Sequence, residues 1–228
     1  MDQQARGFVK RPFVRAAGTT ARAWHDVRRI LAVRLDAMGD VLMTTPALRA
    51  LKELPSEPHI TLLTSPAGAA LASLVPHVDA VIQYSAPWMK ATRTPDRHVD
   101  LALVAQLAEG EFDAAVIFTV YSQSPWPAAF LCHLAGIPLR LAHGRENPYH
   151  LLTDWAIERE PVDSLRHEVT RQLDLVAQIG ARPSDDRLQL SVPPSLREHM
   201  RAQLRALDIT LDGPWILIHP GASGPFRW

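Results

Sequence analysis

The chain has 228 residues, of which 47% are hydrophobic and 21% are charged, as is ordinary for one large or two smaller globular domains. Lysine plus arginine and aspartate plus glutamate both number 24, so the net charge gives no reason to expect a nucleic-acid partner. The single cysteine, Cys132, excludes an internal disulfide and a multi-cysteine metal site, and it fits a reducing, cytoplasmic setting. No apolar run reaches the roughly 18 residues of a membrane span, and there is no secretory signal.

Residues 1–28 differ from the rest of the chain and form a basic leader. The first 29 residues carry many more bases than acids, with Arg6, Lys10, Arg11, Arg15, Arg22, Arg28 and Arg29 against Asp2 and Asp26. This composition predicts a flexible, disordered segment. The alternative is a weak electrostatic tether to an anionic membrane surface.

Residues 30–54 contain the unit on which the later chain is patterned. The apolar run 30–33 continues through Arg34 and Leu35, and it suits a buried strand of a parallel sheet. A turn over 36–40 leads into an amphipathic helix over 41–54. A carboxylate therefore stands at a helix start, on the edge where open α/β sheets bind ligands.

The later chain repeats this alternation of strand and helix. We expect strands at 59–64, 78–84, 112–118 and 139–142, with helices at 66–74, 99–108, 124–134 and 164–179. Residues 87–97 are interpreted as a loop or broken helix, and 143–161 as irregular. The spacing predicts an α/β fold, a doubly wound Rossmann-like parallel sheet over 29–192. The strands starting near 30, 59, 78 and 112 should all be parallel and central.

Residues 193–228 follow this domain with a helix at 194–207 and an apolar strand at 215–219. That strand is interpreted as the first of a second α/β domain. The sequence stops at Trp228, where the next helix is expected, and so few residues cannot form a domain. The second domain is therefore predicted to be truncated, and 215–219 should lie away from the first sheet.

Asp40 is the first candidate for chemistry. One interpretation is a helix N-terminal carboxylate that contributes typically ~1 kcal/mol to stability. The other is a general base, kept ionised by the helix terminus, that accepts a proton from a substrate hydroxyl. Asp36 is a second acid in the same turn and could bind backbone or substrate.

The sequence lacks the motifs of several other classes of binding site. Gly39 is the only glycine in the turn, so the G-x-G-x-x-G pattern of dinucleotide-binding domains is absent, as is a P-loop G-K-[ST]. His133, His143, His150 and His167 show no metal-ligand spacing and are interpreted as surface or satisfied histidines. The sequence predicts no cofactor and no metal.

The second candidate is the stretch 219–223, followed by Arg227. A strand that ends in a turn of small residues can present backbone N–H groups to a phosphate. Ser223 would add a hydroxyl donor and Arg227 a fork of donors. A plain strand-to-helix turn with an exposed arginine is the alternative.

The stretch 34–51, RLDAMGDVLMTTPALRAL, resembles the family 9 glycosyltransferases, the ADP-heptose:lipopolysaccharide heptosyltransferases and their relatives. The shared pattern is a strand, a turn ending in Gly-Asp-Val and a Thr-Pro-Ala-Leu helix. Two later stretches also resemble sequences of this family. They are residues 167–169, at the start of a helix, and residues 219–223 together with 227–228. The resemblance implies the N-terminal half of a GT-B fold, in which two Rossmann-like domains face each other.

The resemblance also implies roles for the candidate residues. Asp40 would be the catalytic base of sugar transfer with inversion from an ADP-sugar donor to a lipopolysaccharide-core or related glycan acceptor. Asp36, Met38, Gly39 and Thr44 would contact the acceptor, and the donor would be bound by Gly221, Ser223 and Arg227. The protein would be cytoplasmic, peripheral at the inner face of the inner membrane. A non-catalytic sugar- or nucleotide-binding module, an inactive truncated relative and an unrelated flavodoxin-like domain remain alternatives.

Overall fold

The computed structural model describes residues 13–15, 21–89, 94–209 and 213–219. These residues fall into two compact units, one ending at Ser191 and the other beginning at Val192. No helix in the described ranges is long and apolar enough to cross a membrane.

A mostly parallel sheet forms the centre of the first unit. Its seven described strands are β1 (Phe13–Arg15), β2 (Arg29–Arg34), β3 (His59–Thr64), β4 (Ala80–Gln83), β5 (Ala114–Ile117), β6 (Leu139–Gly144) and β7 (Asp154–Ile157). Their spatial order is β1-β7-β6-β5-β2-β3-β4. Every neighbouring pair is parallel except β1 and β7, which are antiparallel. The predicted α/β fold class is confirmed.

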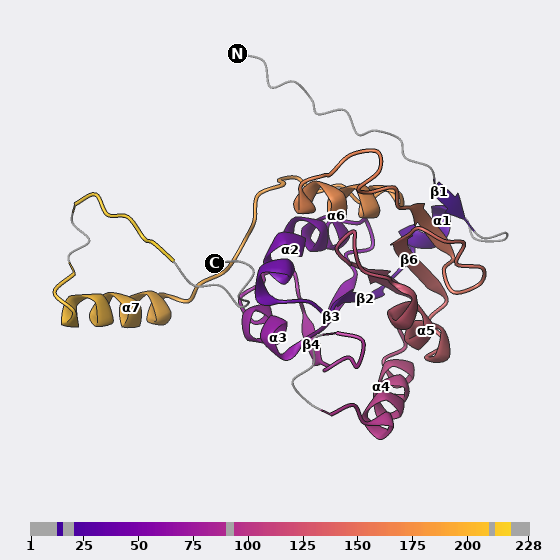
Figure 1. Ribbon diagram of the computed structural model, residues 1–228, viewed down its shortest axis with the longest axis horizontal. Coiled ribbons are helices and arrows are strands. Elements are labelled where there is room, and N and C mark those ends of the chain that lie inside the picture. The colour runs from indigo at the N-terminus through magenta and orange to yellow at the C-terminus, as the bar shows by residue number, and fades with distance from the viewer. Residues whose placement is uncertain (1–12, 16–20, 90–93, 210–212, 220–228) are drawn as a thin grey trace, which may run out of the picture. The chain divides into compact units, whose positions relative to one another are not determined.

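Helices cover both faces of this sheet (Figure 1). They are α1 (Ala21–His25), α2 (Met38–Lys52), α3 (Pro66–Ala72), α4 (Arg97–Glu109), α5 (Trp126–Leu134) and α6 (Glu168–Ala177). One hydrophobic core joins α2, α3 and α6 to one face of the sheet, and a second joins α4 and α5 to the other face. Successive β2 residues alternate between the cores: Ile30 and Ala32 belong to the first, Leu31 and Val33 to the second. Burial on both faces explains why this strand reads as a continuous apolar run.

Two details of the sheet differ from the prediction. The strands that begin near 30, 59, 78 and 112 are parallel, as predicted, but β4 lies at the sheet edge rather than in the centre. Residues 143–161, predicted to be irregular, contain the end of β6 and all of β7. β7 has only four residues, too few for the alternation of its side chains to stand out from the flanking polar sequence.

The predicted leader over 1–28 differs from the structure in its later part. Phe13–Arg15 form β1, paired with β7, and residues 21–25 form α1. Trp24 is fully buried and Val27 nearly so, both within the core on the α2 side. The prediction of a flexible segment is therefore wrong for these residues, because apolar burial outweighs the basic composition. Residues 1–12 and 16–20, which include Arg6, Lys10 and Arg11 of the supposed membrane tether, lie outside the described part of the chain.

The second unit contains α7 (Pro194–Ala206), a solvent-exposed helix. Residues 213–219 form no strand, and Trp215, Ile216, Leu217 and Ile218 are each more than half exposed. The strand predicted at 215–219 is therefore not formed. A strand needs a hydrogen-bonded neighbour, and no described strand pairs with these residues.

Candidate functional site

The candidate site lies at the topological switch point of the sheet. From β2 the chain proceeds outward through β3 and β4, whereas from β5 it proceeds through β6 and β7 in the opposite direction. β2 and β5 are adjacent, so the loops that follow them diverge at the carboxyl ends of the strands. In open α/β sheets this is where ligands bind. The β2–α2 turn and the segment after β5 therefore define the site.

Asp40 lies in the first turn of α2, at this switch point. Its Oδ2 accepts a hydrogen bond from the Ala37 backbone N–H at 3.1 Å, and its Oδ1 accepts one from Arg34 Nη2 at 3.2 Å. The Asp40 side chain is 32% exposed, so a bound ligand can still reach the carboxylate. The residue thus acts as a helix N-terminal carboxylate and remains available for chemistry.

Asp36 lies deeper, with a side chain only 8% exposed. Gln123, from the segment after β5, donates its side-chain N–H to Asp36 Oδ1 and so connects the two loops of the switch point. Arg34 Nε lies 3.0 Å from Asp36 Oδ2, an ion-pair contact without hydrogen-bond geometry. Burial raises the pKa of Asp36 above its ordinary value, although Arg34 and Gln123 act to lower it.

The three remaining residues predicted to contact an acceptor lie in different surroundings. Met38 and Gly39 are the first two residues of α2 and are exposed, so a ligand can reach them. Thr44 is fully buried, and its hydroxyl donates to the Asp40 backbone carbonyl at 2.8 Å. Thr44 therefore offers no exposed surface to an acceptor in this structure, and its hydroxyl is bonded to the previous turn of α2.

A polar cavity of about 200 Å³ opens beside Gln123, at the carboxyl ends of β5, β6 and β7. Tyr121 and Trp126 provide aromatic surface. Hydroxyl, amide, imidazole and charged groups supply most of the remaining lining, from Ser122, Gln123, Ser124, His143, Arg145, Glu146, Glu158 and Arg171. Aromatic surface combined with fixed polar groups is the chemistry that a sugar ring needs, with an apolar face to pack and hydroxyls to bond.

A buried polar network centred on Arg171 of α6 lines part of the cavity. Arg171 donates to Glu158 Oε2 at 2.8 Å and also to the Thr119 carbonyl, which follows β5. His143 Nε2 lies 3.2 Å from the Arg171 carbonyl, so this nitrogen carries the hydrogen, and the buried His143 Nδ1 is an acceptor with no partner among the described residues. Burial acts to raise the pKa of Glu158, but the Glu160 N–H and Arg171 outweigh it, and the pKa is lowered.

Two solved structures have the same architecture. A glycosyl transferase family 9 protein from Veillonella parvula DSM 2008 matches with a TM-score of 0.60 and 18% identity, over 82% of this chain and 51% of that chain. The Escherichia coli ADP-heptose lps heptosyltransferase II matches with a TM-score of 0.60 and 20% identity, over 82% of this chain and 52% of that chain. No protein-family model and no curated protein matches the sequence.

The fold is that of one half of a GT-B glycosyltransferase. The chain spans about half the length of the two solved proteins, and at these identities the likeness establishes the fold alone. The GT-B half identified here contains Asp36 and Asp40 at its switch point. Gly221, Ser223 and Arg227, the predicted donor contacts, lie outside the described residues.

Several residues of the GT-B half that form the site were missed from the sequence. Gln123, His143, Glu158 and Arg171 come from four different segments, and only the tertiary fold brings them to one cavity. Glu168 was noted only as a helix start, although it contacts Arg34. In the described part of the chain, no group of three His, Cys, Asp or Glu side chains is placed to hold a metal ion.

His143 makes stability depend on pH. Burial first, and the Arg171 charge second, lower the pKa of His143 to about 3, so the folded protein keeps this ring neutral. The unfolded chain takes up the proton below about pH 6.5, so stability present above that pH is lost as the pH falls toward 3. Between pH 7 and 5 this loss is on the order of 2 kcal/mol, or roughly 4–8 °C in melting temperature.

Thermal melts of wild type and His143→Gln at pH 7 and pH 5 measure this contribution. Glutamine can still donate to the Arg171 carbonyl but does not titrate, so we expect the variant to lose several degrees less between the two pH values. Glu158 titrates below this window, because its lowered pKa makes its contribution disappear only at more acid pH. Equal losses in both proteins would show that His143 is not buried as a neutral ring.

Proposed function

We propose that this chain carries the acceptor side of an inverting glycosyltransferase of the heptosyltransferase type. The enzyme would move a heptose or related sugar from an ADP-sugar to a lipopolysaccharide-core or similar glycan. The observation that carries the proposal is the partly exposed Asp40 carboxylate at the switch point of the sheet. A polar cavity with aromatic surface is connected to the same turn through Gln123, which lines the cavity and donates to Asp36. The likeness of the fold to two glycosyltransferases supports it.

In this mechanism the acceptor sugar occupies the cavity and directs one hydroxyl toward Asp40. The carboxylate takes the hydroxyl proton as the oxygen attacks the anomeric carbon of the donor. The bond from that carbon to the diphosphate breaks, its electron pair leaves with ADP, and attack from the opposite face inverts the configuration. Ser223 and Arg227 would bind the diphosphate through hydroxyl and guanidinium donors.

A non-catalytic sugar-binding module is the second candidate. It is favoured by the two hydrogen bonds that Asp40 already accepts within the protein, since these suffice for a purely structural role. Both candidates need the cavity to bind glycan, but only the enzyme needs a carboxylate at position 40.

Filling the cavity with a large side chain tests whether it binds the acceptor. Ser122 is an exposed residue of its lining, so Ser122→Trp should fill the space at little cost to stability and weaken binding of a lipopolysaccharide-core oligosaccharide at least about tenfold. Isothermal titration calorimetry on the 228-residue chain measures this affinity. Ser73→Trp is the matched control, because Ser73 is an exposed serine at the end of α3, on the opposite edge of the sheet. Equal affinity in the two variants would remove the cavity from acceptor binding.

A further inference from the structure

Arg34, at the end of β2, is a fully buried cation that three carboxylates approach from three segments. Within the described residues its ion-pair contacts are Asp36 Oδ2 at 3.0 Å, Asp40 Oδ1 at 3.2 Å and Glu168 Oε1 at 3.1 Å. A buried guanidinium is costly unless it is paired, so this clustering fixes the turn, α2 and α6 around one charge. Proton transfer from the acceptor hydroxyl to Asp40 does not by itself require three acids at one arginine.

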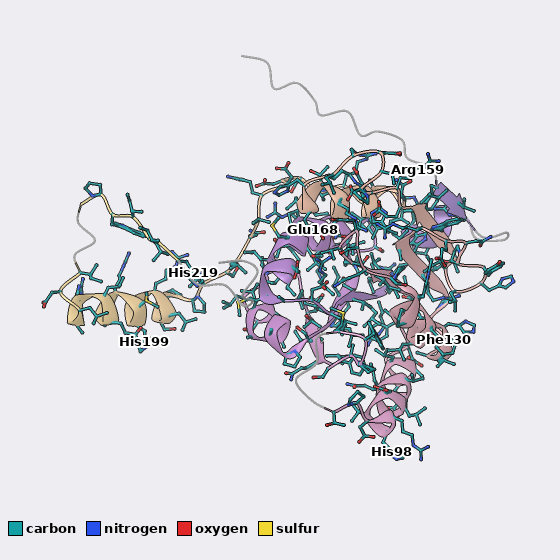
Figure 2. All side chains as sticks on the ribbon, viewed as in Figure 1. His98, Phe130, Arg159, Glu168, His199 and His219 are labelled. Atoms are coloured by element: carbon teal, nitrogen blue, oxygen red, sulfur yellow. The ribbon has the colours of Figure 1, made fainter. Side chains whose placement is uncertain are left out.

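A single nitrogen of Arg34 is shared by two of these acids. Nη2 contacts both Asp40 and Glu168. Glu168 stands where α6 begins (Figure 2), and α6 packs against α2. Gln172, one turn later, donates its side-chain amide to Glu168 and to the Thr119 carbonyl, the latter at 3.1 Å. Glu168 is thus held in place independently of Asp40.

We propose that Arg34 is the positioning residue of Asp40, and that Glu168 keeps Arg34 paired while Asp40 carries the proton of the acceptor. The inference rests on the proposed function and extends it. Arg34 holds Oδ1 while the Ala37 N–H holds Oδ2, which fixes the plane of the carboxylate. When the acceptor O–H bond breaks and the Asp40 O–H bond forms, Asp40 loses its charge, and Arg34 remains paired with Glu168 and Asp36.

The charges around Asp40 predict how the rate should depend on pH. Arg34 Nη2 lies 3.2 Å from Asp40 Oδ1 and 3.1 Å from Glu168 Oε1, so a change of charge at Arg34 or Glu168 changes the electrostatic potential at Asp40. Glu168→Gln removes one negative charge, so the acidic limb of the kcat/KM profile should move to lower pH by at least about half a unit. Arg34→Leu removes the cation, so the limb should move to higher pH.

Transfer is measured with the full-length protein. In Glu168→Gln, kcat should fall about tenfold with the acceptor KM within about twofold, because binding is intact and only the base is altered. Asp79→Asn is the matched control, since it removes a carboxylate from the ion pair with Lys52 on the opposite edge of the sheet and should not move the limb. Opposite movements in Glu168→Gln and Arg34→Leu support the proposal. A loss of thermal stability in the two variants with no shift of the acidic limb of the kcat/KM profile overturns it. If Arg34→Leu does not fold, the shift of the limb in Glu168→Gln is the deciding measurement.

A second measurement does not depend on activity. Carbon-13 NMR follows the titration of the Asp40 carboxyl group in the 228-residue chain. In Glu168→Gln the midpoint of this titration should lie at lower pH than in the wild type. If the midpoint shifts in Glu168→Gln but the wild type transfers no sugar, the glycosyltransferase function is rejected and the pairing of Arg34 with Asp40 and Glu168 is supported. Transfer by the wild type with an unmoved titration in the variant would reject the pairing while supporting the function.

Discussion

Replacing Asp40 with asparagine should lower glycosyl transfer at least about a hundredfold while leaving the melting temperature almost unchanged. Asparagine caps a helix nearly as well as aspartate, because its one amide oxygen can still accept the hydrogen bond from the Ala37 N–H. Its NH2 group cannot accept from Arg34, which keeps Asp36 and Glu168 as partners. It cannot take a proton from the acceptor hydroxyl, so only the chemical step should suffer. Acceptor affinity should also stay near that of the wild type, because the cavity that would bind the sugar is unaltered.

The comparison requires three measurements on the same protein preparations: thermal melting, acceptor binding and transfer by the full-length protein. Asp36→Asn is the informative companion, because Asp36 is the other acid of the turn and is largely buried against Arg34 and Gln123. We expect it to lose stability more than Asp40→Asn does. Transfer by Asp40→Asn within a few-fold of wild type would remove Asp40 from the mechanism and favour a binding module.

Replacing Trp24 with alanine should destabilise the fold by about 3–5 kcal/mol, the usual cost of truncating a fully buried tryptophan. The side chain packs in the core on the α2 side, and its Nε1 donates to Asp154 Oδ2 at 3.1 Å. Asp154 is itself fully buried and would keep only Arg15 and Thr153 as partners in the described structure. Loss of packing and loss of a charged hydrogen bond therefore act together.

Urea unfolding of the 228-residue chain gives this difference, with Trp24→Phe as the graded control. Phenylalanine keeps most of the buried ring but not the N–H, so it should cost about 1–3 kcal/mol. Deletion of residues 1–27 removes Trp24 and β1 together and should destabilise at least as much as Trp24→Ala. A Trp24→Ala variant within about 1 kcal/mol of wild type would mean that this part of the chain is not packed in solution.

The sequence by itself determined the fold class and the position of Asp40. β2 is apolar along nearly its whole length because both of its faces are buried, and the turn that follows it contains one glycine and two acids. These are local properties, since strand burial, helix initiation and the pattern 34–51 all lie within about twenty neighbouring residues. For the same reason the sequence located Asp36 but could not tell that it is buried against Arg34 and Gln123.

Only the tertiary structure decided what surrounds Asp40 and what the first residues do. Arg34 and Glu168 are far apart in the sequence, and they meet because α6 packs against α2. Gln123 reaches Asp36 because the strand order places β5 beside β2 and so creates the switch point. Trp24 lies in a basic stretch whose composition predicts disorder, yet its ring fills a space in the core and its N–H pairs with Asp154 on β7. Such long-range contacts depend on how strands and helices are arranged in space, and local composition does not specify that arrangement.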